Sequence, residues 1–120
     1  MSLHSTGLAA LVIVWTKVYA SIYGVDPYFA LGVFNVESGV PGQEFRAGLM
    51  GKTYYGPAGI HRSFLTRWPI DDLKTNIEVG VAALRGKSPR AVLRRYNKEW
   101  NIEYEQAVLA AADRYRRELR

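Results

Sequence analysis

The sequence predicts a mainly α-helical fold: a single domain over residues 1–120, with a small irregular or β-hairpin segment after its second helix. Three observations lead to this prediction. Apolar residues recur at spacings of three and four along several stretches, which is the period of an amphipathic helix. Capping residues, often followed by proline, precede these stretches. Glycines and two prolines concentrate in residues 39–59, which disfavours a long helix there.

The first helix is expected from about Ser5 to Tyr23, ending at Gly24. Its apolar run Leu8–Trp15 is too short to cross a bilayer, so we interpret it as the inner face of the helix and expect no integral membrane segment. No basic residue precedes this run, and Lys17 follows it, so it does not have the pattern of a standard secretory signal.

The second helix is bounded by Asp26-Pro27, an N-cap followed by proline at the first helical position, and by Gly39. One of its faces carries Ala30, Val33, Phe34 and Glu37, at spacings of three and four. The face that seeks the core therefore also carries an acid. Partial burial and the negative end of the helix dipole should both raise the pKa of Glu37, as a general acid requires.

After the second helix, residues Phe45–Tyr55, with Gly51-Lys52 near the middle, are expected to form a small β-hairpin. A short helix from His61 to Trp68 should follow and end at Pro69. We expect the three tryptophans to pack in or near the core.

Three further helices complete the expected fold. Asp71 or Asp72 caps a helix that Gly86 ends, Ser88-Pro89 opens a short one, and Asn101 opens the last. The residues expected to face the core are Leu73, Ile77, Val81 and Leu84 in the first of these helices and Tyr104, Val108, Ala111, Tyr115 and Leu119 in the last.

Composition excludes several kinds of chemistry. The chain has no cysteine, hence no thiolate nucleophile and no cysteine-based zinc site. Only His4 and His61 could supply imidazole, and they lie far apart in the sequence, so a metal enzyme is improbable. A net charge of +5 suggests an anionic partner. The basic residues Arg85, Lys87, Arg90, Arg94 and Arg95 could meet anionic glycan strands and their peptide carboxylates, or form a solvated face.

Five pieces of the sequence, in order and at similar spacings, resemble the soluble lytic transglycosylase family over roughly residues 17–115. The pieces are Tyr23-Gly24-Val25-Asp26-Pro27, Val36-Glu37-Ser38-Gly39, Tyr55-Gly56-Pro57-Ala58-Gly59-Ile60-His61, Asn76-Ile77 with Gly80 and Ala83-Leu84, and Tyr96-Asn97. Each piece alone is common, whereas five in order are fairly specific. The resemblance implies a lysozyme-like fold and an enzyme that cleaves the peptidoglycan glycan between N-acetylmuramic acid and N-acetylglucosamine.

The resemblance also implies roles for individual residues. Glu37 matches the single catalytic acid/base, and Ser38 matches the serine that supports it and the nearby N-acetyl group. Tyr96 and Asn97 match the pair that lines the cleft beside the carboxylate. Tyr54 and Tyr55 could stack on sugar rings, because a flat apolar ring with a hydroxyl suits carbohydrate, or they could cover a core edge. Of the two, we expect Tyr55 to bind substrate.

The main departure from the family lies at Gly59-Ile60-His61, where the family usually has Gly-Leu-Met-Gln. We expect these three residues to contribute to substrate binding, with His61 more often a packing or capping residue than a catalyst. Gly48-Leu49-Met50-Gly51 imitates the motif more closely in letters. It follows Glu37 too soon to leave room for a hairpin, so we favour the later match.

The mechanism implied by the resemblance needs one carboxyl group and no cofactor. Glu37 protonates the glycosidic oxygen, the substrate's own N-acetyl group stabilises the positive centre, and Glu37 then removes the proton of the muramoyl 6-hydroxyl to form a 1,6-anhydro ring. A two-carboxylate glycosidase would need a second acid, and Glu44 is the only one nearby in the irregular segment.

Two alternatives stay open. One is a goose-type-like muramidase that hydrolyses the same bond with water, and the other is a noncatalytic basic helical module that binds wall polymer or nucleic acid. Under the favoured interpretation the partner is the peptidoglycan glycan strand rather than nucleic acid, and the protein is a monomer that acts in the periplasm or cell wall. The missing signal pattern suggests a virion-associated, phage-borne lysin or export by another route.

Overall fold

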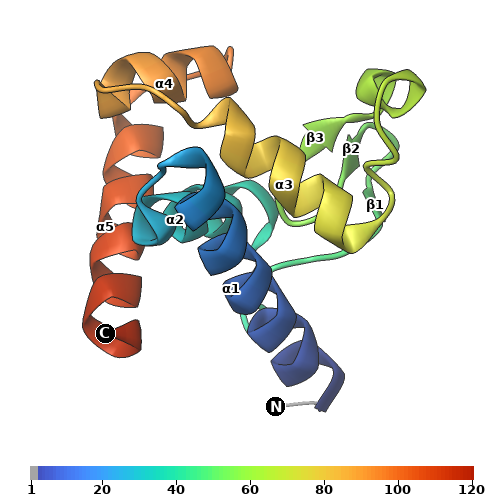
Figure 1. Cartoon of the computed structure of the whole chain (residues 1–120), viewed down its shortest axis with the longest axis horizontal. Helices are drawn as coiled ribbons and strands as arrows, with labels where there is room; N and C mark the ends of the chain where they lie inside the picture. The colour runs from blue at the N-terminus through green and yellow to red at the C-terminus, as the bar shows by residue number, and fades with distance from the viewer. Residues whose placement is uncertain (1–2) are drawn as a thin grey trace.

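Five α-helices, one 3-10 helix and three two-residue strands make up the part of the chain that the computed structural model describes, residues 3–120, with side chains from Gly7 onward (Figure 1). In chain order they are α1 (Leu3–Tyr23), α2 (Pro27–Ser38), β1 (Leu49–Met50), β2 (Tyr54–Tyr55), β3 (Ile60–His61), η1 (Arg62–Thr66), α3 (Leu73–Ala83), α4 (Pro89–Tyr96) and α5 (Ile102–Leu119). The predicted mainly α fold is confirmed. Its Cα radius of gyration, 13.1 Å, is that of one compact domain of this length.

The central helix is α2, which packs against α5 on one side and α1 on another. Ala30, Val33 and Phe34 are fully buried, as their spacing predicted. The contact with α5 is close because Gly32 has no side chain: a Cβ placed there would lie 2.6 Å from the carbonyl oxygen of Val108. In Figure 1, α5 runs along one side of the molecule and the small sheet lies on the other, with α2 between them.

The first helix packs mainly against α3, and its apolar run is only partly inward-facing. Val12 is fully buried, whereas Leu11 and Val14 are 49% and 53% exposed. The prediction that Leu8–Trp15 forms the inner face was therefore too broad, because eight consecutive residues wrap around more than two turns of a helix. Among residues 3–120, no helix is both apolar and long enough to pass through a membrane.

The irregular segment forms an antiparallel sheet in the order β1-β2-β3. Met50 pairs with Tyr54 and Tyr54 pairs with His61, so the predicted hairpin exists, with shorter strands, and is extended by a third strand. The expected helix from His61 to Trp68 was wrong in its start and type. His61 ends β3, and its side chain caps the 3-10 helix η1, which ends at Thr66.

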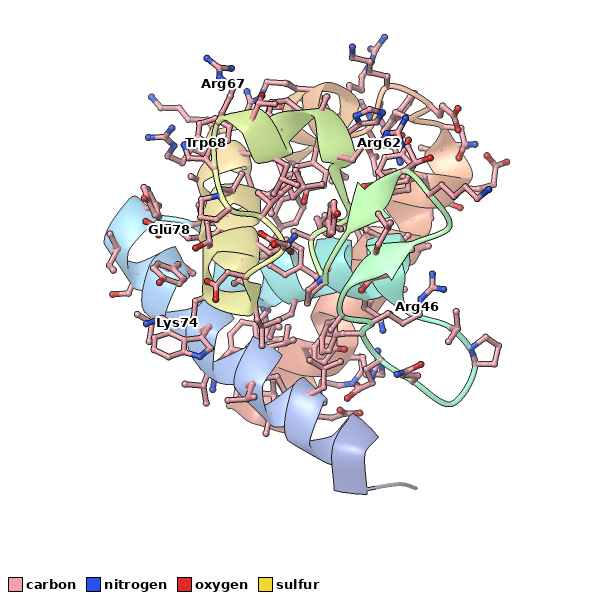
Figure 2. All side chains as sticks on the ribbon, turned by 90° about the vertical axis from the view of Figure 1, so that its right-hand side faces the viewer. Arg46, Arg62, Arg67, Trp68, Lys74 and Glu78 are labelled. Carbon is pink, nitrogen blue, oxygen red and sulfur yellow. The ribbon has the colours of Figure 1, made fainter. Side chains whose placement is uncertain are left out.

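Trp68 does not pack in the core. It is 41% exposed and stacks on Phe64, with ring centroids 5.9 Å apart, while Arg67 lies 5.3 Å from its ring. Figure 2 shows Arg67 and Trp68 together at the edge of the molecule. Trp15 and Trp100 are partly buried against the core, as predicted.

The remaining helices begin where their caps predicted. Asp72 caps α3, Ser88 caps α4 and Asn101 caps α5, each accepting a hydrogen bond from a backbone N–H three residues later. Helix α3 ends at Ala83, three residues before the predicted Gly86. The predicted core faces of α3 and α5 are inside: Ile77, Val81, Leu84, Val108, Ala111 and Tyr115 are buried, and Leu73, Tyr104 and Leu119 pack against the core.

Candidate functional site

Glu37 lies at the end of α2, where three distant parts of the chain meet. Its Oε2 accepts a hydrogen bond of 2.6 Å from the hydroxyl of Tyr104, in the first turn of α5. The same oxygen accepts a 3.4 Å bond from the Nδ2 of Asn97, the residue that caps the end of α4. The side chain is partly buried. Helices α2, α4 and α5 thus converge on one carboxylate oxygen.

Local sequence explains how each of these side chains reaches the site. Glu37 is one turn beyond the buried Phe34 and so follows the core face of α2 outward. Asn101 caps α5 and accepts from the backbone N–H of Tyr104 at 2.7 Å, which fixes the first turn of that helix. The Tyr104 side chain then lies on the stripe that faces α2.

Burial raises the pKa of the Glu37 carboxyl above its ordinary value, because the charged form loses solvation. The hydrogen bonds from Tyr104 and Asn97 lower this pKa, but burial has the larger effect. The direction agrees with the sequence-based expectation. Burial, together with the negative charge of Glu37, also raises the pKa of the Tyr104 hydroxyl, so Tyr104 stays a protonated donor near neutral pH.

The second carboxylate oxygen of Glu37 lies beside Gly59. A Cβ built on Gly59 would lie 3.2 Å from the Cβ of Glu37 and 3.6 Å from its Oε1, and the backbone there has φ +61°, which favours glycine. Gly48 and Gly51, by contrast, have nothing within 4 Å of such a Cβ. The glycine beside the acid is therefore that of Gly59-Ile60-His61, the later of the two candidate motifs.

Tyr96 faces the same turn, one residue before Asn97. Its hydroxyl donates a 2.5 Å hydrogen bond to the carbonyl oxygen of Ala58, and burial raises its pKa well above the ordinary value. Tyr96 and Asn97 are thus brought together with Glu37 and Gly59: Asn97 contacts the acid directly, and Tyr96 ties the end of α4 to the turn that carries Gly59.

The other predicted site residues lie around this cluster in different ways. Ser38 is fully buried, donates to the carbonyl oxygen of Phe34 and accepts from the backbone N–H of Arg46, so it holds the chain that leaves α2. Ile60 is buried and pairs with the partly buried Tyr55. Neither Ser38 nor Ile60 presents a side chain to solvent beside Glu37.

His61 is exposed, and its structural role accounts for its contacts. Its Nδ1 accepts from the backbone N–H of Ser63 at 3.1 Å, and its ring meets Tyr54 edge to face at a centroid distance of 5.6 Å. This is the capping role that the sequence favoured over a catalytic one.

Sequence reasoning missed two residues that build the site. Tyr104 was expected only as a core residue, although it is the stronger partner of Glu37. Asn76 is buried in α3: its Oδ1 accepts from the N–H of Ala58 at 3.0 Å, and its Nδ2 donates to the carbonyl oxygens of Tyr55 and Ile70. It thereby fixes the turn that holds Gly59. Asn76 belongs to one of the five pieces that carry the family resemblance, but it was given no role there; a polar residue inside an apolar helical stripe was the further signal for it.

Glu44 is held away from Glu37. Its Oε1 accepts hydrogen bonds of 3.1 Å from Arg114 and from the hydroxyl of Tyr115. Tyr115 is eleven residues beyond Tyr104 on α5, a rise of about 16 Å. Paired glycosidase carboxyls lie about 5–9.5 Å apart. Glu44 is therefore poorly placed as a second catalytic acid.

The remaining acids offer few alternatives. Asp26, Glu78, Glu105 and Asp113 are bonded to other side chains, and Asp72 caps α3. Glu118 lies 3.9 Å from Arg114. Asp71, Glu99 and Glu103 are exposed, and the backbone N–H of Glu99 donates to the Oδ1 of Asn97. Over the described part of the chain, no group of three or more possible metal ligands gathers.

Comparison with known proteins gave no further assignment. No protein-family model matches the chain, and no curated protein or solved structure matches it either.

Proposed function

We propose that the protein is a peptidoglycan lytic transglycosylase that cleaves the β-1,4 bond between N-acetylmuramic acid and N-acetylglucosamine, with Glu37 as its single acid and base. One observation carries the proposal: the partly buried carboxyl group of Glu37, whose pKa is raised by burial, accepts hydrogen bonds from Tyr104 and Asn97 and lies beside Gly59. An acid of this kind can donate a proton to the leaving oxygen and take one back.

The hydrogen bonds indicate which oxygen of Glu37 carries the proton that is transferred. Oε2 already accepts from Tyr104 and Asn97, so the acidic proton belongs on Oε1, beside Gly59. Oε1–H gives its proton to the glycosidic oxygen as the bond from that oxygen to the muramoyl C1 breaks. The ionised Oε1 then takes the proton of the muramoyl 6-hydroxyl as its oxygen bonds to C1. No water is consumed, and Glu37 is again protonated on Oε1 at the end of the reaction.

The intramolecular 6-hydroxyl is a strong competitor for C1 because it is tethered to the reacting ring. Such groups act with effective molarities of 10⁵–10⁸ M in well-oriented systems. Hydrolysis requires instead a group that directs water. Two exposed acids adjoin the site residues in the sequence and are the candidates for that role: Glu99, whose backbone N–H donates to Asn97, and Glu103, which precedes Tyr104. They are the reason to keep a muramidase as the second candidate function.

Product analysis tests the proposal. Purified peptidoglycan is digested with the wild type and with Glu37→Gln, Glu44→Gln and Glu99→Gln, and the released muropeptides are weighed by mass spectrometry. We expect 1,6-anhydro products, lighter by one water than hydrolysis products. Glu37→Gln should lower cleavage by at least about 10²- to 10⁴-fold, while Glu44→Gln, the matched control, keeps the anhydro products.

Other outcomes would overturn the proposal in distinct ways. Reducing muramic acid ends that disappear in Glu99→Gln would identify a muramidase. Binding to sacculi without release of any muropeptide would identify a noncatalytic wall-binding module. Near wild-type cleavage by Glu37→Gln would remove Glu37 from the mechanism.

A further inference from the structure

An open hollow of about 630 Å³ lies between the C-terminal ends of α3 and α4. Its lining residues are Ala82, Ala83, Arg85, Gly86, Arg95 and Tyr96. Two guanidinium groups supply its charge, and the other residues are small or aromatic. The mechanism proposed above uses neither arginine.

The two arginines are unpaired but fixed in place. Both are exposed, and within residues 3–120 neither forms an ion pair, whereas Arg90, on α4 like Arg95, binds Glu105. The guanidinium of Arg85 lies 5.6 Å from the centroid of the Tyr23 ring, a contact that leaves its N–H donors free. The Nε of Arg85 donates to the carbonyl oxygen of Ala82 at 2.8 Å. The Nη2 of Arg95 donates to the carbonyl oxygens of Ala83 and Arg85.

These bonds leave most of each guanidinium available. An arginine has five N–H donors. Arg85 uses one of them, and Arg95 uses those of a single nitrogen. Anchored side chains lose less rotamer entropy when a ligand arrives, and the planar fork of a guanidinium matches a carboxylate with two parallel bonds. The hollow therefore presents free, pre-oriented N–H donors that suit a planar anion.

Two consecutive residues at the end of α4 connect the hollow to the Glu37 site. Tyr96 lines the hollow, and Asn97, the next residue, donates to the Oε2 of Glu37. A glycan placed with its reacting muramoyl unit at Glu37 would carry the peptide stem of that unit toward one side of the site. The stem is attached to muramic acid and bears free carboxylates.

We propose that the hollow between α3 and α4 binds a carboxylate of the peptide stem, through Arg85 and Arg95, and so makes the protein prefer peptide-bearing glycan. This inference rests on the proposed function, since it requires peptidoglycan at Glu37. Nucleic acid fits the hollow less well. Binding of single strands relies on several stacking rings, and here the one aromatic residue, Tyr96, is tied by its hydroxyl to Ala58.

The test compares two substrates: glycan strands with their peptide stems, and the same strands after an amidase has removed them. The double variant Arg85→Gln/Arg95→Gln is measured against the wild type. Exposed charge pairs contribute modestly to binding, because water and salt screen them. We therefore expect the variant's loss of kcat/KM, carried by KM, to be about threefold to tenfold greater on peptide-bearing strands, and to shrink as salt is added.

Arg94→Gln is the matched control, because Arg94 is an exposed neighbour on α4 with the same charge change but lies over Trp100, outside the hollow. Equal losses on both substrates, or an equal loss in Arg94→Gln, would overturn the inference. If the glutamine variant folds poorly, Arg85→Lys/Arg95→Lys takes its place. It keeps both charges but lacks the planar guanidinium fork, so it should show a smaller loss of the same kind.

A binding experiment separates this inference from the proposed function. Glu37→Gln is titrated with a disaccharide-tetrapeptide and with the corresponding peptide-free disaccharide. Tighter binding of the peptide-bearing probe that depends on Arg85 and Arg95 supports the inference even if no strand is cleaved. Equal affinities for the two probes would overturn it, as would binding of single-stranded DNA that is lost in the same double variant. Peptide-free strands carry no stem carboxylate, so their cleavage by the wild type tests the catalytic role of Glu37 without involving the hollow.

Discussion

At the scale of single residues, the two oxygens of Glu37 have different surroundings. Oε2 accepts from Tyr104 and Asn97, and Oε1 faces the backbone at Gly59. Burial pushes the pKa of the carboxyl up while the two donors pull it down, and burial prevails. Substitution of Tyr104 or Asn97 should therefore change the pKa of Glu37 without moving its side chain.

Tyr104→Phe tests this balance. The substitution removes the hydroxyl that stabilises the charged form of Glu37, so the pKa of Glu37 should rise further. Because cleavage requires the protonated acid, the alkaline limb of the kcat/KM profile should move to higher pH. The pH dependence of muropeptide release measures this shift.

Tyr28→Phe is the control for that experiment. Tyr28 lies at the opposite end of α2, about 13 Å away along the helix axis, and should leave the profile in place. An alkaline limb that stays fixed in Tyr104→Phe, or moves to lower pH, would mean that Tyr104 does not tune the acid that limits cleavage.

At the scale of secondary-structure elements, the sequence predicted best what local chemistry decides. The helix starts at Asp26-Pro27, Ser88-Pro89 and Asn101 were correct because a cap and the N–H groups it binds lie within three or four residues. The sequence did not predict strand β3 or the start and type of helix η1. Strand β3 depends on pairing with β2 and on the turn that Asn76, in α3, fixes from a distance.

The same distinction holds for the candidate site. Glu37 was predictable because its helix places an acid in line with Ala30, Val33 and Phe34. The family resemblance then suggested Tyr96, Asn97 and Gly59. The Tyr104 contact spans 67 residues, and no local pattern indicates it. Tyr104 also fits an apolar helix stripe, so its residue type alone could not distinguish a core role from a site role.

Asn76→Asp tests whether α3 positions the turn beside Glu37. The new side chain has the same shape but directs a carboxylate at the carbonyl oxygens of Tyr55 and Ile70, which Asn76 now binds as a donor. Losing two buried hydrogen bonds in this way should lower the free energy of unfolding by about 2–4 kcal/mol. Urea unfolding at neutral pH measures the change.

Asn101→Asp makes the identical substitution where only an acceptor is needed. Its side chain caps α5 by accepting from Tyr104, and aspartate caps helices as well as asparagine does. The control should be neutral or slightly stabilising. Equal effects at the two positions would mean that the donor role of Asn76 contributes little to stability.

At the scale of the whole molecule, the partial burial of Glu37 lowers the stability of the fold at higher pH. The pKa of Glu37 is raised in the folded protein, which means that the folded state binds its proton more tightly than the unfolded chain does. Below the ordinary glutamate value of 4.5, both states are protonated and folding is unaffected by this group. As pH rises from 4.5 through the raised pKa, the unfolded chain gains from ionisation that the folded protein resists, so stability falls.

Glu37→Gln should therefore stabilise the protein while it abolishes cleavage. Glutamine is nearly isosteric, and its Oε1 can accept from Tyr104 and Asn97 as the carboxylate Oε2 does now. The amide never ionises, so the variant avoids the loss of stability that the wild type undergoes with rising pH. Its melting temperature should exceed that of the wild type at pH 7 and above, and the difference should vanish as pH falls toward 4.5.

Melting curves of the two proteins between pH 4 and 8 measure this difference, with Glu99→Gln as an exposed control that should follow the wild type. A Glu37→Gln variant that is less stable than the wild type at pH 7 would contradict the prediction, because it would show that the charged carboxylate is favoured in the folded protein. The raised pKa of Glu37 would then be contradicted, and with it the argument for Glu37 as general acid.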